Sequence, residues 1–236
     1  MIAAMPVEKQ KGAAERLLRI AYTAATKNPA LLRCDPNSIV AAVVEASQMG
    51  LSVDGVLGHA YLVPYGNIAQ MQLGYRGLIA LAYRSGRIQR FACDTVYDGD
   101  VFDYGEGTAP YLVHKKPMKG PRGECIGAYA VAHLKDAALP MFRVMPIDEV
   151  LAHRDRSSGW QAFAAKKVRT TPWDTDPDAM AQKTAVRMLG KLLPVTEVQE
   201  AAARDEQRDQ GVIGSPASLE ELDTGFIAGE VDNGEA

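Results

Sequence analysis

Residues 59–87 read HAYLVPYGNIAQMQLGYRGLIALAYRSGR, and their pattern predicts a strand, a tight turn, a second strand and a helix. Apolar and polar side chains alternate on both sides of Gly66-Asn67, a dipeptide with the chemistry of a short hairpin turn. Pro64 cannot donate a ladder hydrogen bond, so the first strand is predicted at a sheet edge or a bulge. The helix is predicted to end at Gly86 and is rich in arginine.

Three further helices are predicted outward from this stretch. Residues 8–26 are amphipathic, and residues 36–50 follow an aspartate in the N-cap position with proline at the first helical position. Residues 177–193 begin in the same way after Asp176 and end before a proline. The basic segment 157–172 has no clear period and is predicted to be irregular.

The remaining elements are short. Strands and helices do not alternate regularly along the chain, which favours an α+β fold with a mostly antiparallel sheet over a βαβ arrangement. Strands are predicted at 87–97, 100–106, 125–135 and 140–146, with a short helix at 147–154.

Composition limits the class of protein. The chain has 236 residues, 47% of them hydrophobic, which suits one globular domain with appendages or at most two small domains. Its three cysteines are far apart and form no CxxC pair, so neither a disulfide framework nor a zinc site is expected. The N-terminus lacks the apolar region of a signal peptide, and no apolar run approaches the roughly 20 residues of a membrane span. We therefore expect a cytoplasmic protein.

Charge is distributed unevenly. Residues 196–236 hold eleven Asp and Glu against two Arg, for a net charge of −9, whereas residues 1–195 have a net charge of +6. We therefore predict a core at 1–195, with a helical N-terminus at 1–50, and an acidic, partly flexible tail at 196–236. A basic core suggests a polyanionic partner, although an ordinary surface with a solubilising tail fits the same numbers.

Enzyme motifs do not account for these features. The chain has no GxxxxGK[ST], GxSxG or HExxH, so nucleotide-driven or hydrolase chemistry is not indicated. Asp98, Asp100 and Asp103 could hold Mg²⁺ for phosphodiester hydrolysis, which makes a metal-dependent nuclease one alternative. A turn rich in Asp and Gly is the other interpretation of the same residues.

Cations recur at spacings that suit a nucleic acid. Lys183, Arg187 and Lys191 are four residues apart and form one stripe on the predicted helix. This stripe either follows the phosphates of a strand or is a solvated face. Tyr75 beside Arg76 offers a stacking surface next to a cation, as in proteins that hold single strands, or Tyr75 belongs to the core.

Two more groups of cations are candidates for contact with a nucleic acid. Arg84 and Arg87 are expected on the helix that Arg76 begins, and the spacing of Arg76 and Arg87, eleven residues or three turns, places them on one face. The segment LVHKKPMKGPRGE is predicted to be a loop, and such basic loops either clamp backbone phosphates or are plain surface loops. Its cations are Lys115, Lys116, Lys119 and Arg122.

The motifs resemble a known family. GHAYLVPYGN…QMQLGYRGLIALAYRSG, preceded by NPALLRCDPNSIVAAVVEASQMGL, is similar to the RecT family of phage and prophage single-strand annealing recombinases. PYLVHKKP…GECIGAYAVAHLKD and PWDTDPDAMAQKTAVRMLGKLLP continue the resemblance in the same order, across 28–195.

The resemblance implies a protein without covalent chemistry that binds single-stranded DNA and anneals complementary strands without ATP. It also implies a curved sheet with packed helices, similar to the eukaryotic single-strand annealing ring proteins, and a homo-oligomeric ring or helical filament. The expected partners are a phage 5′–3′ exonuclease and the host single-strand-binding protein. No cofactor is expected, and Mg²⁺ assistance to annealing stays open.

One rival interpretation assigns the activity to the tail: a non-catalytic adaptor that acts through 196–236. The residues expected to contact DNA on the annealing interpretation are Tyr75, Arg76, Arg84, Arg87, Lys115, Lys116, Arg122, Lys183, Arg187 and Lys191.

Overall fold

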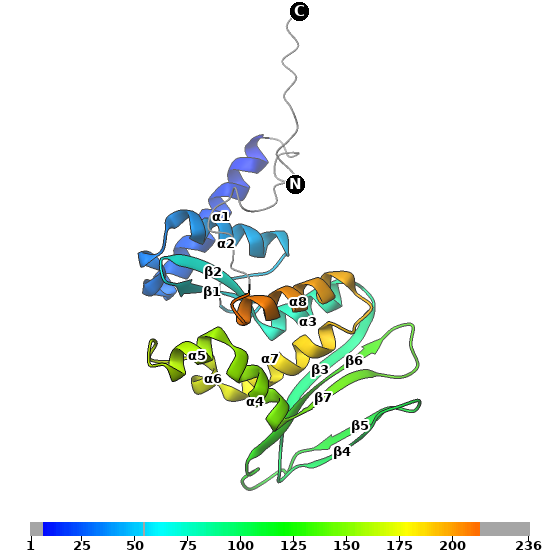
Figure 1. The fold of residues 1–236 in the computed structure, drawn as a ribbon. Helices are drawn as coiled ribbons and strands as arrows, with labels where there is room; N and C mark the ends of the chain where they lie inside the picture. Colours follow the sequence, from blue (N-terminus) through cyan, green and yellow to red (C-terminus); the bar gives the residue numbers. More distant parts are fainter. Residues whose placement is uncertain (1–6, 54, 213–236) are drawn as a thin grey trace, which may run out of the picture. The chain divides into compact units, whose positions relative to one another are not determined.

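The computed structural model describes residues 7–53 and 55–212, which form two compact units. The N-terminal unit ends at Leu73 and the C-terminal unit begins at Gly74 (Figure 1). The boundary therefore lies inside the stretch that predicted the hairpin and the following helix.

The N-terminal unit packs helices against a hairpin. Its elements are α1 (Val7–Lys27), a short 3-10 helix (Pro29–Arg33), α2 (Pro36–Gln48), β1 (Ala60–Tyr65) and β2 (Ile68–Leu73). Asp35 caps α2 by accepting a hydrogen bond from the backbone N–H of Asn37 at 3.1 Å. The Ser38 hydroxyl accepts from the N–H of Ala69 at 2.9 Å, which ties α2 to β2.

The C-terminal unit carries all ten residues expected to contact DNA. Its elements are α3 (Tyr75–Arg84), β3 (Ile88–Tyr97), β4 (Val101–Gly105), β5 (Tyr111–Lys115), β6 (Cys125–Leu134), β7 (Met141–Pro146), α4 (Ile147–Arg156), α5 (Ser158–Ala164), α6 (Pro172–Thr175), α7 (Pro177–Gly190) and α8 (Thr196–Asp209).

An antiparallel sheet in the order β3-β6-β7 separates two layers in this unit (Figure 1). Side chains alternate across β6, so Tyr129 points to one face while Ala128 and Ala130 point to the other. Tyr129 stacks on Phe102 of the β4–β5 hairpin, with ring centroids 5.7 Å apart. The fully buried alanines leave room for α7 to pack closely on the opposite face.

Helix α8 packs against α3 and α7. Gly190, near the end of α7, makes this close approach possible. A Cβ at that position would lie 3.3 Å from Val198 and 3.4 Å from Ala202, both in α8. The first third of the predicted acidic tail, 196–209, is therefore a packed helix of the C-terminal unit, and residues 213–236 lie outside the described residues.

The α+β class with antiparallel strands is confirmed, as are the hairpin and the caps of α2 and α7. Across residues 7–53 and 55–212, the strands form three separate antiparallel sheets instead of one. Two local predictions were wrong: residues 112–115, expected in a loop, form most of β5, and the segment 157–172 contains α5. Among the helices of the described residues, none has the length and apolarity required to cross a bilayer.

Candidate nucleic-acid interface

The middle of β3 is where three of the expected cations meet. Lys116 forms an ion pair with Asp94, and Arg122 donates to the carbonyl of Thr95 at 3.1 Å. Arg76, in the first turn of α3, is near enough for its charge to act on Cys93 of β3. Burial raises the pKa of the Cys93 thiol to about 11, Asp94 adds to this rise, and the positive charge of Arg76 opposes it. Three segments distant in sequence thus bring cations toward one short stretch of strand, and two of these cations are paired with carboxylates, Lys116 with Asp94 and Arg122 with Asp100.

Tyr75 and Arg76 form the first turn of α3. The Arg76 guanidinium lies 5.9 Å from the centroid of the half-buried Tyr75 ring, within the range of a cation–π contact. No side chain caps this helix at Gly74, so its first N–H groups and its dipole add positive potential beside Arg76. The predicted aromatic ring beside a cation is present in this geometry, and stacking of a base on that ring stays a prediction.

Arg122 is held inside the fold. Its Nε donates to Oδ1 of Asp100 at 2.9 Å, and a terminal nitrogen donates to Oδ2 at 2.5 Å. His114 Nε2 lies 2.9 Å from the same carboxylate, whose side chain is fully buried. The hydrogen bonds from Arg122, supported by His114, hold the pKa of Asp100 well below its usual range despite burial.

The same guanidinium lies over the ring of Tyr97, 4.2 Å from its centroid. The Tyr97 hydroxyl in turn donates to Asp178, at the start of α7, at 2.5 Å, and this hydrogen bond raises the pKa of Tyr97 to about 12. Arg122 thereby links the loop before β6 to the sheet, because its bonds go to protein atoms.

The carboxylates of the nuclease hypothesis have separate partners. Asp100 binds Arg122 and His114, Asp98 accepts from the N–H of Glu124 at 3.0 Å, and Asp103 accepts from the Tyr111 hydroxyl at 3.3 Å. Within the described residues, no three His, Cys, Asp or Glu side chains are grouped as a metal site would require. The cluster that this hypothesis needs is not formed.

The predicted exposed stripe on α7 is wrong as a description of its surface. Only 2% of Arg187 is exposed, and it donates to Asp205 at 3.3 Å and Asp209 at 3.1 Å in α8. Burial opposes the charge of Arg187, but these carboxylates outweigh it and raise its pKa.

The two outer cations of the stripe, Lys183 and Lys191, also have their partners in α8. Lys183 pairs with Asp205 at 3.2 Å, and Lys191 pairs with Glu206. One signal was available in the sequence: Asp205 and Asp209 are four residues apart, so both acids lie on one face of a helix. Nothing in the spacing showed that this face meets α7.

The two arginines at the end of α3 have different environments. Arg84 is exposed at the last turn, whereas Arg87 donates to the carbonyl of Pro194 at 2.6 Å and to Asp136 at 3.0 Å. The expectation that Arg76 and Arg87 share a helical face was wrong, because α3 ends at Arg84 and Gly86 turns the chain at a φ of +75°.

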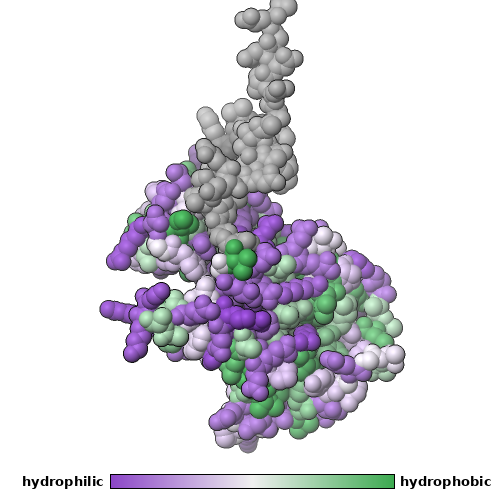
Figure 2. Space-filling view, in the orientation of Figure 1, coloured by the Kyte–Doolittle hydropathy of each residue, from purple (hydrophilic) through white to green (hydrophobic). Residues whose placement is uncertain are grey.

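Several cations outside the expected set are more accessible. Lys166, Lys167 and Arg169 follow α5, are exposed, and have no ion-pair partner in the part of the chain that the structure describes. Figure 2 shows hydrophilic side chains projecting at the left of the view, where Figure 1 places this turn. Lys119, on the segment after β5, is also exposed and without an ion-pair partner among the described residues, as is Lys115 of the expected set, the last residue of β5. The sequence offered one indication of Lys166, Lys167 and Arg169, because the segment 157–172 contains these three cations and no acidic residue.

Comparison with known proteins gives a consistent result. The family model described as RecT family matches residues 15–217. The chain is 38% identical to Protein RecT of Escherichia coli strain K12 over 234 residues, which cover 94% of this chain and 81% of that protein. It is 39% identical over 201 residues to the Uncharacterized protein YqaK of Bacillus subtilis strain 168, covering 81% and 64% of the two chains.

These matches, on an α+β fold with several clusters of cations, define a DNA recombination protein of the strand-annealing class. The chain belongs to the RecT family. The resemblance noted in the sequence motifs is confirmed over most of the chain.

Proposed function

We propose that the protein binds single-stranded DNA and anneals it to a complementary strand without ATP. The observation that carries this proposal is the match to the RecT family across 15–217, which includes every described cation of the C-terminal unit. The exposed Arg76 beside the Tyr75 ring supports it, because a cation next to an aromatic surface suits a phosphate and its neighbouring base.

The binding mode follows from the types of residue involved. Exposed cations neutralise phosphates and fix the path of the strand, while the Tyr75 ring supplies a surface on which a base stacks. Bases that face away from the cations stay free to pair, so complementarity is tested by Watson–Crick pairing and the protein contributes shape and charge. Lys115 and Arg84 are the expected residues best placed for direct contact, since both are exposed and have no ion-pair partner among the described residues.

Of the other expected residues, Arg122 and Arg187 act indirectly in this scheme. Both bind carboxylates of the fold, so they position the β5–β6 segment and α8. The active species is a homo-oligomer, as a ring or a helical filament similar to the eukaryotic annealing rings. A phage 5′–3′ exonuclease supplies the single strand, and the host single-strand-binding protein is a second partner.

Sequential addition of two strands tests the proposal. The protein is first saturated with a fluorescent oligonucleotide, and the complementary or a scrambled strand is then added without nucleotide, with and without Mg²⁺. We expect a complex that retains both strands only when they are complementary. Release of the first strand, or equal retention of the scrambled strand, would refute annealing on the protein.

A further inference from the structure

The segment between β5 and β6 (116–124), called the β5–β6 loop below, has a closely packed base. The carbonyl of Arg122 accepts from the N–H of Gly99 at 2.9 Å, and the carbonyl of Glu124 accepts from the N–H of Asp98 at 3.0 Å. A Cβ on Gly99 would lie 2.9 Å from the Arg122 carbonyl oxygen, so the backbones touch there. Gly123 has a φ of +79°, and a Cβ at that position would collide with the Asp98 carboxylate.

Side chains reinforce this base. The bidentate pair of Arg122 with buried Asp100 fixes the loop to the turn between β3 and β4. The contact of Arg122 with the Tyr97 ring adds a second direction of restraint. The base of the loop is therefore held by both backbone and side-chain contacts.

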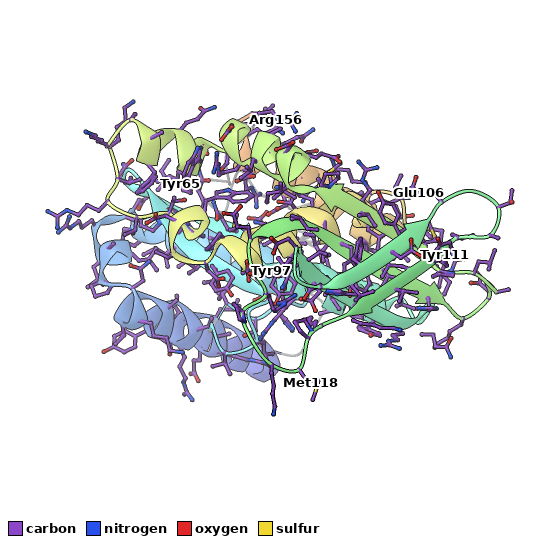
Figure 3. The ribbon with its side chains drawn as sticks, turned by 90° about the horizontal axis from the view of Figure 1, so that it is seen from below. Tyr65, Tyr97, Glu106, Tyr111, Met118 and Arg156 are labelled. Carbon is purple, nitrogen blue, oxygen red and sulfur yellow. The ribbon has the colours of Figure 1, made fainter. Side chains whose placement is uncertain are left out.

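The tip of the loop projects into solvent. Met118 is 97% exposed, more than any other large hydrophobic side chain of the described residues, of which the next is Tyr22 at 75%. Figure 3 labels Met118 at the outer edge of the ribbon, away from Tyr97. Pro117 and Pro121 restrict the backbone on either side of it, so the position of the tip is limited even though its side chains are exposed.

The neighbours of Met118 indicate what covers it. Lys115 and Lys119 are exposed and have no ion-pair partner within the described ranges, while Lys116 binds Asp94. An apolar side chain between two free cations fits a ligand with negative charges spaced along an apolar surface. Single-stranded DNA has this chemistry, because bases present apolar faces between charged phosphates. An apolar protein surface would leave the two lysines without anions.

We propose that Met118 inserts between neighbouring bases of the bound single strand, with Lys115 and Lys119 on the flanking phosphates. This inference rests on the proposed DNA-binding function. Methionine is among the apolar residues that act as wedges in DNA, and its flexible thioether adapts to any pair of bases. The inserted side chain would interrupt stacking at one step per subunit and so keep the bases apart and available for pairing. Asp100 and Arg122 are positioning residues for this wedge.

Base stacking reports the insertion directly. An oligonucleotide with 2-aminopurine fluoresces more strongly where the probe is unstacked, so saturation with the wild-type protein should raise its signal several-fold. Met118→Ala should lose most of this rise while its affinity for the strand falls by no more than about threefold, and Met118→Leu should retain it. Leu139→Ala, at an exposed apolar position in the turn after β6, is the matched control and should behave as wild type.

Oxidation of the unmodified protein gives an independent measurement. Dilute hydrogen peroxide transfers one oxygen atom to an accessible thioether and leaves as water, and mass spectrometry locates the sulfoxide. Single-stranded DNA should slow the oxidation of Met118 at least fivefold. Buried Met71 and Met145 should remain unoxidised throughout and show that the fold is intact.

An unchanged fluorescence rise in Met118→Ala, or oxidation of Met118 at the same rate with and without DNA, would overturn the wedge. So would an effect of Met118→Ala on self-association alone in sedimentation, which would assign the tip to a second copy of the chain. Absence of strand binding by the wild-type protein would refute the proposed function itself. Titration of the oligonucleotide with wild-type protein measures this binding, so failure of the proposed function is distinguished from failure of the wedge alone.

Discussion

Arg187 in α7 donates a hydrogen bond of 3.1 Å to Asp209 in α8, and the arginine is almost completely buried. An arginine in that environment needs its carboxylates, because an unpaired buried charge is costly. The pairing of α7 with α8 is therefore part of the fold of the C-terminal unit. It removes Arg187 from the set of residues available to a phosphate.

Arg187→Ala should destabilise the protein by about 3 kcal/mol, because Asp205 and Asp209 lose their buried partner. Thermal unfolding should then occur ~6–12 °C lower. Arg204→Ala, at an exposed cation on α8, should leave the midpoint unchanged. An unaltered melting curve with weaker DNA binding would instead restore Arg187 as a direct contact.

Two truncations separate the packed part of the acidic tail from the rest. Removal of residues 196–236 deletes α8 and exposes the cations of α7 and the surface around Gly190, so the C-terminal unit should lose its cooperative unfolding transition. Removal of residues 213–236 alone should preserve both the transition and annealing. Loss of annealing on removal of residues 213–236 would instead support the interpretation of the protein as an adaptor that acts through its tail.

Asp100→Asn should show a pH-dependent loss of stability. Hydrogen bonds from Arg122 keep the pKa of folded Asp100 below its unfolded value, so its contribution is present above about pH 4 and is lost as pH falls further. Urea unfolding should therefore place the variant about 3 kcal/mol below wild type at pH 7, and the gap should narrow by pH 3. Asp136→Asn, at an exposed pair with Arg87, is the control and should barely change stability. A gap that is constant with pH would contradict this role for Asp100.

The salt dependence of binding reports how many phosphates the protein neutralises. Each phosphate of a single strand that a lysine neutralises steepens the fall of log K with log salt by about 0.7, so Lys115→Ala with Lys119→Ala should flatten the slope by about 1.4. Lys135→Ala, at an exposed lysine just after β6, should leave the slope as in wild type. An identical slope in the double variant would exclude these two lysines from binding phosphate.

Incubation of end-labelled DNA with the protein and Mg²⁺ tests the nuclease alternative. Because Asp98, Asp100 and Asp103 each have a different protein partner, we expect full-length strands on a denaturing gel. Shortened strands that disappear in Asp103→Asn would overturn this assignment of the carboxylates.

Caps and turns in the sequence predicted individual helices and strands, but the sequence did not show which helices pack against each other. The Asp35 cap and the Gly66-Asn67 turn act within a few residues, so the boundaries of α2 and the hairpin could be read from the chain. The fate of Arg187 depended on Asp209, 22 residues away, and on the packing angle of two helices. A residue spacing cannot show whether a cation faces water or an acid of another helix.

The same reason explains Arg122. The basic loop around Arg122 suggested phosphate contact. In the structure Arg122 binds the buried carboxylate of Asp100, in the turn between β3 and β4, and no sequence periodicity indicates such a contact. The sequence shows Met118 as an apolar residue in that loop. Its exposure follows from the fold, which holds the base of the loop and leaves the tip in solvent.

The most direct test of strand annealing is the rate at which two complementary, secondary-structure-free oligonucleotides pair at low salt in the absence of any nucleotide. A fluorophore on one strand and a quencher on the other should report pairing at least tenfold faster with the protein than without it. High salt should abolish the acceleration, because the contacts are electrostatic. A rate equal to that of spontaneous pairing at low salt, with a protein that binds the single strand, would contradict the central claim.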